Sequence, residues 1–145
     1  EKEPGYFYEV EVPYLGEDRA NHEYPQKDFF DAGCVVTTGS DYPVTIPPAP
    51  LAAIQVGATR CWLDGDKDTL LGKDQIVTVA QMVKSATYNG AYQNFAEDRT
   101  GSLEVGKNAD ITVLDKDIMT IDPLEISNTK VLRTILNGSD VYTAK

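Results

Sequence analysis

The spacing of apolar residues along the chain changes near residue 97. Upstream of this point, apolar positions recur at helical intervals, as at Leu51, Ile54 and Ala58. Downstream, short runs of β-branched residues lie between turn-forming residues, a pattern typical of strands. The pattern predicts an α/β segment over 1–96 followed by a β-rich segment over 97–145. Helices are expected over 26–32, 51–60 and 78 to about 88.

Capping residues mark the ends of these helices. Gly33 follows the first helix in the place of a C-terminal cap. Thr78 and Gln81 have the spacing of a capping box, which predicts the start of the third helix. Asn89-Gly90 predicts where that helix stops, with one further turn over 91–96.

The clearest strand signals lie near the C-terminus. Ile111–Leu114 and Val131–Leu136 are rich in β-branched residues, and Asn137-Gly138 separates the second run from Asp140–Tyr142. Asn and Gly accept the positive φ angles of a tight hairpin turn, so this arrangement predicts a β-hairpin. Near the N-terminus, the aromatic and alternating residues over 6–12 predict a strand or an extended edge segment.

A further strand is expected over Cys34–Asp41, because an apolar, β-branched run here is bounded by glycines. The run ends in a carboxylate, Asp41. Active sites of barrels and open parallel sheets lie at the C-terminal ends of strands, which makes Asp41 a candidate for chemistry. Ser40, Asp41 and Pro43 are also good turn formers, so the local sequence alone favours an ordinary turn over a site.

The net charge of the chain disfavours some classes of binding partner. Thirteen basic and twenty-three acidic residues give a net charge of −10, which disfavours binding to nucleic acid or to anionic lipid surfaces. No apolar stretch has the length of a membrane span. Cys34 and Cys61 both have apolar neighbours, and we expect buried, reduced thiols in a cytoplasmic protein, with one disulfide as the alternative.

Metal-binding signals in the sequence are weak. The single histidine, His22, cannot form a histidine-based metal site, and no C-x-x-C pattern is present. We expect His22 to be a surface or capping residue. Arg60 closes a predicted helix, where the helix dipole favours a cation, so a structural role is expected with a substrate-side role as the alternative. Lys107 lies in a turn and is expected to face solvent or to belong to a hairpin.

Several stretches together carry a resemblance to a known family. The chain resembles the C-terminal part of the metal-dependent amidohydrolase superfamily, and most of all its YtcJ-like branch, amidohydrolase family 3. The stretch 101–111 at its distance from Gly-Ser-Asp is the most specific part of the resemblance. The matching stretches, in order, are 24–33, GSDYPV over 39–44, ATYNGA over 86–91 and GSLEVGKNADI over 101–111.

The resemblance implies an architecture. Family members are similar to a TIM barrel with a small β-sandwich built from both ends of the chain. On this mapping Cys34–Asp41 is the last barrel strand, 51–92 is the closing helical region and the chain from Gly101 is the C-terminal half of the sandwich. A complete barrel needs about 250 residues. The chain is therefore expected to be a C-terminal fragment of a TIM-barrel hydrolase.

The resemblance also implies a chemistry. In the parent, Asp41 would be a metal ligand and a catalytic proton-transfer group, with zinc as the expected divalent metal. The implied reaction is hydrolysis of amide or cyclic amide C–N bonds, other than peptide bonds, in a small molecule, with metal-bound hydroxide as the nucleophile. The other ligands of the family are missing from this sequence, so the fragment alone is expected to bind no zinc tightly and to be inactive.

A second function stays open. The chain could be a non-catalytic folding or oligomerisation module derived from an amidohydrolase. A barrel strand without its neighbours leaves N–H and C=O groups open. We therefore expect new strand pairing within the chain, a homo-oligomer joined at exposed edges, or partial disorder over Cys34–Ser40.

Overall fold

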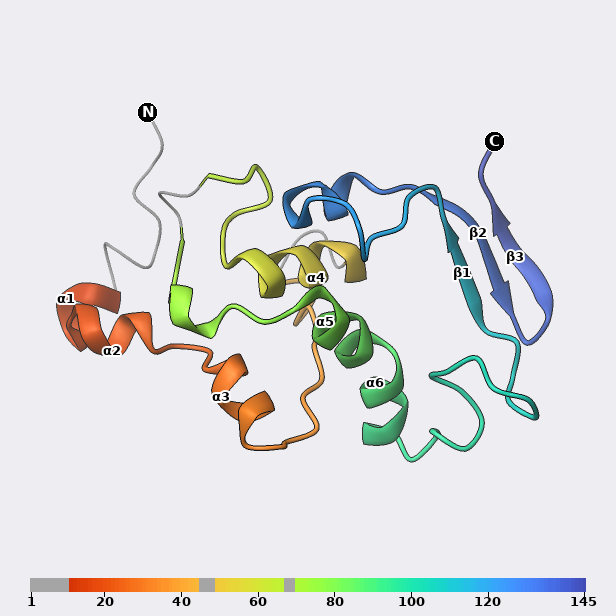
Figure 1. The fold of residues 1–145 in the computed structure, drawn as a ribbon, viewed down its shortest axis with the longest axis horizontal. Coiled ribbons are helices and arrows are strands. Elements are labelled where there is room, and N and C mark those ends of the chain that lie inside the picture. Colours follow the sequence, from red (N-terminus) through yellow and green to blue (C-terminus); the bar gives the residue numbers. More distant parts are fainter. Residues whose placement is uncertain (1–10, 45–48, 67–69) are drawn as a thin grey trace.

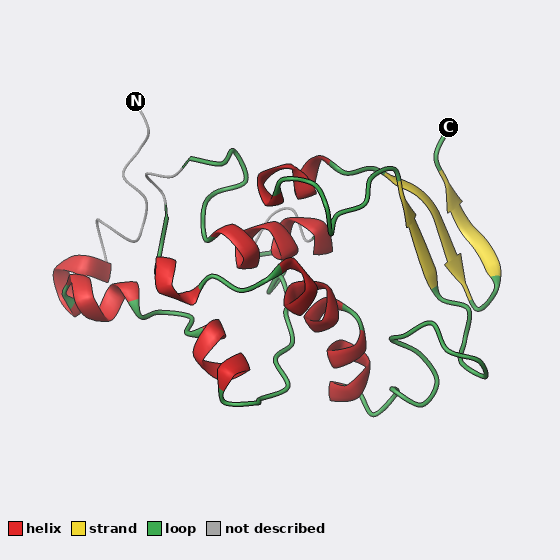
Figure 2. Cartoon of the chain, in the orientation of Figure 1, coloured by secondary structure: helices red, strands yellow, loops and turns green. Residues whose placement is uncertain are grey.

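Helices and strands occupy different ends of the molecule (Figure 2). The computed structural model describes residues 11–44, 49–66 and 70–145. Within these residues, the 3-10 helices are η3 (Lys73–Gln75) and η4 (Pro123–Asn128). The α-helices are α1 (Val12–Leu15), α2 (Glu17–Asn21), α3 (Gln26–Asp31), α4 (Pro50–Thr59), α5 (Val79–Ala86) and α6 (Tyr88–Gln93). The strands are β1 (Ile111–Leu114), β2 (Val131–Leu136) and β3 (Ser139–Thr143).

The N-terminal strand prediction is wrong in its described part. Residues 6–10 of that prediction lie outside the described residues, and Val12 begins the short helix α1. Proline lies in the first turn of α1, at Pro13. Proline lacks the N–H that a strand ladder needs but is accepted in the first turn of a helix, which accounts for the helix.

Helix α3 ends in the cap that Gly33 predicts. Gly33 has a φ angle of 78° and its N–H donates to Phe30 O at 3.0 Å. The N–H of Cys34 donates to Phe29 O at 2.9 Å. These two bonds have the pattern of a Schellman motif, which turns the chain out of the helix.

Helix α5 begins as predicted and ends earlier than predicted. Thr78 Oγ1 accepts from Gln81 N at 3.2 Å, and Gln81 Oε1 accepts from Thr78 N at 2.9 Å, which is the capping box. The helix ends at Ala86, because Thr87 leaves helical geometry and its hydroxyl donates to Val83 O. The prediction that Asn89-Gly90 stops the helix is wrong, since both residues lie inside α6.

The hydrophobic core lies between α4, α5 and η4, at the centre of the molecule (Figure 1). It consists of Ile54, Val77, Met82 and Ile126. Helices α4 and α5 approach closely. A Cβ added at Gly57 would lie only 2.4 Å from the Met82 side chain. Glycine at this position therefore lets Met82 fill the space beside α4.

Buried glutamines join segments that are far apart in the sequence. Gln55 is fully buried; its Nε2 donates to Leu63 O, and its Oε1 accepts from Ser127 N at 2.8 Å. Gln75 Oε1 accepts from the backbone N–H groups of Lys27 and Asp28, in the first turn of α3. The glutamine thus satisfies open N–H groups of a helix whose own N-cap, Pro25, supplies no side-chain bond.

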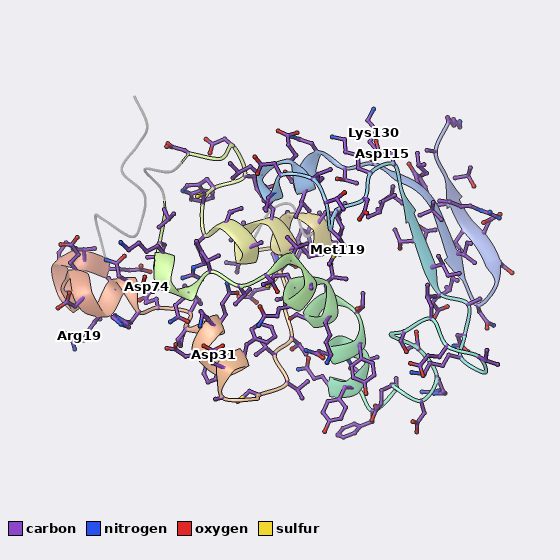
Figure 3. The ribbon with its side chains drawn as sticks, in the orientation of Figure 1. Arg19, Asp31, Asp74, Asp115, Met119 and Lys130 are labelled. Carbon is purple, nitrogen blue, oxygen red and sulfur yellow. The ribbon has the colours of Figure 1, made fainter. Side chains whose placement is uncertain are left out.

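The strands form a three-stranded antiparallel sheet in the order β1-β2-β3. The predicted runs over 111–114, 131–136 and 140–142 all lie in these strands. Asn137 and Gly138 join β2 to β3 with φ angles of 49° and 78°, which confirms the predicted hairpin. At the start of β2, Asp115 and Lys130 lie beside one another, and Lys130 N donates to Asp115 Oδ1 at 2.8 Å (Figure 3).

The sheet projects from one end of the helical layer, opposite α1 and α2 (Figure 1). All five residues of β3 are exposed. In the part of the chain that the structure describes, no helix is both long enough and apolar enough to cross a lipid bilayer.

Candidate functional site

The segment Cys34–Ser40, which leads to Asp41, is not a strand in the described structure. The strand prediction is wrong here, since none of the described strands pairs with this segment. Two side chains of α6 bond it instead. Asn89 Nδ2 donates to Val36 O at 2.8 Å, and Thr37 Oγ1 donates to Gln93 Oε1 at 2.8 Å. Without a neighbouring strand, side chains take the place of part of the ladder.

The prediction for the cysteines is half right. Both thiols are free, and Cys61 is buried as expected. Cys34 is exposed, because it lies at the start of the segment whose expected neighbouring strands are not found among the described residues.

Asp41 lies in a turn at the end of this segment. Val44 N donates to Asp41 O at 2.8 Å, and Asp41 has a φ angle of 50°. The residue is exposed, as are Tyr42 and Pro43. Within the described residues, no donor bonds to the Asp41 carboxylate. The local turn and a chemical role are therefore compatible, because the turn uses the backbone of Asp41 and leaves its carboxylate available.

A complete metal site is not formed by the described residues. No group of three or more His, Cys, Asp or Glu side chains among residues 11–44, 49–66 and 70–145 could hold a metal ion. A catalytic zinc takes about three protein ligands, whereas Asp41 can supply one carboxylate. The donor set of these residues does not fit a metal by itself.

His22 has the capping position that the sequence predicts. It is the C-cap residue of α2, it is exposed, and its Nδ1 donates to Asp18 O at 2.6 Å. This bond satisfies a carbonyl near the end of the helix. The imidazole is thereby engaged in local structure.

Arg60 joins three separate backbone segments. It follows α4 with a φ angle of 59° and is buried. Its Nε donates to Leu71 O at 2.8 Å, its Nη2 to Glu23 O at 3.1 Å and its Nη1 to Tyr24 O at 3.5 Å. Burial lowers the pKa of the Arg60 guanidinium from its usual value. The contacts are those of a structural residue, and they extend well beyond the last turn of its own helix.

Lys107 is mostly covered, so the expectation of a solvent-facing side chain is wrong. Its side chain is 13% exposed. Lys107 Nζ donates to Ser102 Oγ at 2.6 Å and to Glu104 Oε1 at 3.1 Å, and it lies 5.6 Å from the centre of the Tyr88 ring. A hydrogen bond from Ser102, followed by the effect of Lys107, lowers the pKa of Glu104. The motif at 101–107 thus attaches the β-rich segment to α6.

The sequence assigned Asn89 only a helix-ending role, although its surroundings make it a positioned polar group. Its side chain comes from α6 and is 4% exposed. A polar side chain on a short helix is common and gives no sign of its partner. The only available signal was its place in the stretch ATYNGA over 86–91.

Comparison with known proteins shows a family match and several relatives of this chain. The model of the amidohydrolase family matches residues 8–142. YtcJ of Bacillus subtilis strain 168, named as an amidohydrolase, is 29% identical over 131 residues, which are 90% of this chain and 25% of that protein. The N-substituted formamide deformylase of Arthrobacter pascens is 30% identical over 120 residues, which are 79% of this chain and 20% of that protein.

Two further relatives agree with these matches. The imidazolonepropionase of Fusobacterium nucleatum is 32% identical over 106 residues, 72% of this chain and 22% of that protein. The crystal structure of an amidohydrolase from Thermotoga maritima superposes with a TM-score of 0.57 at 22% identity, covering 81% of this chain and 25% of that chain. The chain spans between a fifth and a quarter of the length of these relatives. Because the family model extends over nearly all of it, the chain belongs to the amidohydrolase family.

Proposed function

We propose that this chain contributes Asp41 to the active site of a metal-dependent hydrolase. One observation carries the proposal: the family match over 8–142 includes Asp41, which ends an extended segment with its carboxylate exposed and unbonded among the described residues. An exposed carboxylate at such a position can bind a cation or accept a proton.

The proposed reaction is hydrolysis of an amide or cyclic amide C–N bond, other than a peptide bond, in a small molecule. The names of the relatives support this substrate class, since one is an N-substituted formamide deformylase and others are imidazolonepropionases. The chain has no excess of basic residues that would favour a polyanionic substrate.

The proposal includes a divalent metal, with zinc as the first choice. When bound, such a metal lowers the pKa of water and so supplies a nucleophile near neutral pH. The described residues do not fit a complete metal site, so the remaining ligands must come from residues outside this set. We also propose that Cys34–Asp41 is the last strand of a TIM barrel, which would give the segment the neighbouring strands that it does not have among the described residues.

Zinc titration of the chain by calorimetry tests the ligand count. We expect no stoichiometric site of micromolar or tighter affinity, because one carboxylate does not hold zinc. A tight site that is abolished by Asp41→Ala would contradict this expectation and would show that the chain supplies further ligands.

Substitution in the protein that contains this chain tests the role of Asp41. We expect Asp41→Asn to reduce hydrolysis of N-formylamines or cyclic amides by about a hundredfold or more. The matched control is Asp31→Asn, since Asp31 is an exposed carboxylate on α3 that pairs with Lys27 (Figure 3). Equal activity in both variants would reject the proposed role.

A second candidate, a non-catalytic oligomerisation module, is favoured by the open sheet. Strand β3 is an edge strand with all residues exposed, and Leu132, Leu136 and Val141 are exposed on the same sheet. Light scattering over a range of concentrations tests this candidate. A dimer that persists at low concentration and is lost in Val141→Lys would favour the module.

A further inference from the structure

The segment that leads to Asp41 is held by one face of α6. Asn89 and Gln93 are four residues apart on this helix, so their side chains lie on the same side. They bond consecutive residues of the segment, Val36 and Thr37. The start of the segment is fixed separately, since Cys34 N donates to Phe29 O.

The Asn89 bond is the stronger of the two α6 contacts. Asn89 is 4% exposed, whereas the bond between Thr37 and Gln93 is exposed to solvent. A buried amide that lost its acceptor would carry the full cost of desolvation, so the bond to Val36 O resists opening. Water competes directly for the exposed bond and weakens it.

The segment Cys34–Ser40 pairs with none of the described strands, so few other contacts restrain it. Past Thr37, the backbone hydrogen bonds among the described residues resume at the Asp41–Val44 turn, so the residues between them are restrained mainly by the bonds at Val36 and Thr37. A shift at Val36 would therefore be transmitted along the extended chain to Asp41.

We propose that Asn89 is a positioning residue for Asp41: its side-chain amide fixes the Val36 carbonyl and thereby sets where the Asp41 carboxylate lies. The role given to Asp41 rests on the proposed function, whereas the anchoring of the segment does not. Asn89 acts through the backbone and touches no reacting atom, so it is distinct from a catalytic residue.

The test replaces the donor without changing the shape of the side chain. Asn89→Asp puts an ionised carboxylate, which accepts but cannot donate, opposite the Val36 carbonyl. In the isotopically labelled chain we expect the heteronuclear NOE of the amides from Thr37 to Asp41 to fall, because the backbone N–H groups of these residues donate to none of the described acceptors and their NOE reports the order of the segment directly. We expect amide exchange in α4 to stay unchanged.

Asn94→Asp is the matched control. Asn94 is the C-cap residue of α6, and its Nδ2 donates to Gly90 O at 2.8 Å, so its bond stays within α6 and does not involve the segment. This variant should leave the NOE of the amides from Thr37 to Asp41 unchanged. Acidification provides a second control, because the carboxyl group introduced by Asn89→Asp can donate once protonated and should restore order at Asp41.

The outcomes separate this inference from the proposed function. If Asn89→Asp leaves the NOE of the segment unchanged, or also accelerates amide exchange throughout α4, Asn89 is no more than a core residue and the inference is wrong. If the segment loosens selectively while Asp41→Asn leaves hydrolysis intact, the anchoring stands and the proposed function fails.

Discussion

The helical layer and the three-stranded sheet bury their side chains to very different extents. In the helical layer, Met82 and Ile126 are at most 1% exposed, and buried Gln55 and Arg60 bond segments distant in sequence. In the sheet, every residue of β3 is exposed and the strands contact mainly one another. Both regions belong to the same chain, and the difference lies in where the hydrogen-bond and packing partners of each region come from.

The comparison shows two ways in which backbone N–H and C=O groups find hydrogen-bond partners. The sheet pairs its own strands through a local hairpin and needs little from the rest of the chain. The helical layer depends on long-range bonds, such as those of Gln75 to the start of α3. A substitution that breaks one contact should therefore destabilise the helical layer as a whole, whereas in the sheet its effect should stay local.

Met82→Ala should show the largest effect. Met82 fills the space beside Gly57 in the core, and its removal leaves a cavity between α4 and α5. We expect a loss of about 2–5 kcal/mol in the free energy of unfolding, measured by urea denaturation. Met119→Ala, at an exposed methionine, should cost much less. Similar losses in both variants would contradict the placement of the core.

Arg60→Met should come second. The variant keeps the aliphatic stem and removes the donors to the carbonyls of Glu23, Tyr24 and Leu71. We expect a loss of about 1–3 kcal/mol, because partly buried carbonyls are left without donors. Arg19→Met is the control, since Arg19 is an exposed residue of α2 whose side chain, among the described residues, donates only to the nearby Leu15 O (Figure 3). A control loss above about 0.5 kcal/mol would weaken the comparison.

Asp110→Asn should act on the sheet side in a pH-dependent way. The backbone N–H of Asn137, and then the hydroxyl of Thr100, lower the pKa of Asp110. A carboxyl group whose pKa is lower in the folded chain stabilises the fold above its unfolded pKa, and this contribution is lost as the pH falls through the lowered value.

Unfolding at two pH values measures this effect. We expect Asp110→Asn to be less stable than the wild type at about pH 7, and the difference to narrow below the ordinary aspartate pKa of about 3.9. Thr100→Val removes one of the two bonds and should give an intermediate loss. A difference that does not change with pH would show that the carboxylate charge is not involved.

Arg133→Met should have the smallest effect. Arg133 binds both carboxylate oxygens of Asp140 across β2 and β3, but both side chains are about half exposed. Exposed ion pairs contribute little because water and salt screen them. We expect a smaller shift in the melting temperature than for Arg60→Met, and a still smaller one in high salt. A larger shift than for Arg60→Met would reverse the comparison between the two regions.

Local sequence signals predicted the features whose hydrogen bonds join residues close to one another in the sequence. The Thr78–Gln81 capping box, the Gly33 cap and the Asn137-Gly138 hairpin all form where expected. Each depends on backbone geometry that the residues themselves favour. The family resemblance, from stretches over 24–111, agrees with the family match.

Predictions that depended on distant partners failed. Cys34–Ser40 has the composition of a buried strand, yet it is not a strand, because strand formation needs a neighbour that composition cannot supply. The coverage of Lys107 by Tyr88 was missed for the same reason. Asn89 and Gln75 were missed because an amide side chain has no local signature of the carbonyl or N–H it will meet.

The sequence by itself determined the helix caps, the hairpin, the acidic surface and the identity of Asp41 as the candidate carboxylate. The tertiary structure alone decided that Asp41 ends a segment held by Asn89 and that its carboxylate is exposed. The physical reason is the range of the interactions. Caps and turns are set by the backbone preferences of adjacent residues, whereas the position of Asp41 depends on a hydrogen bond between residues 53 positions apart.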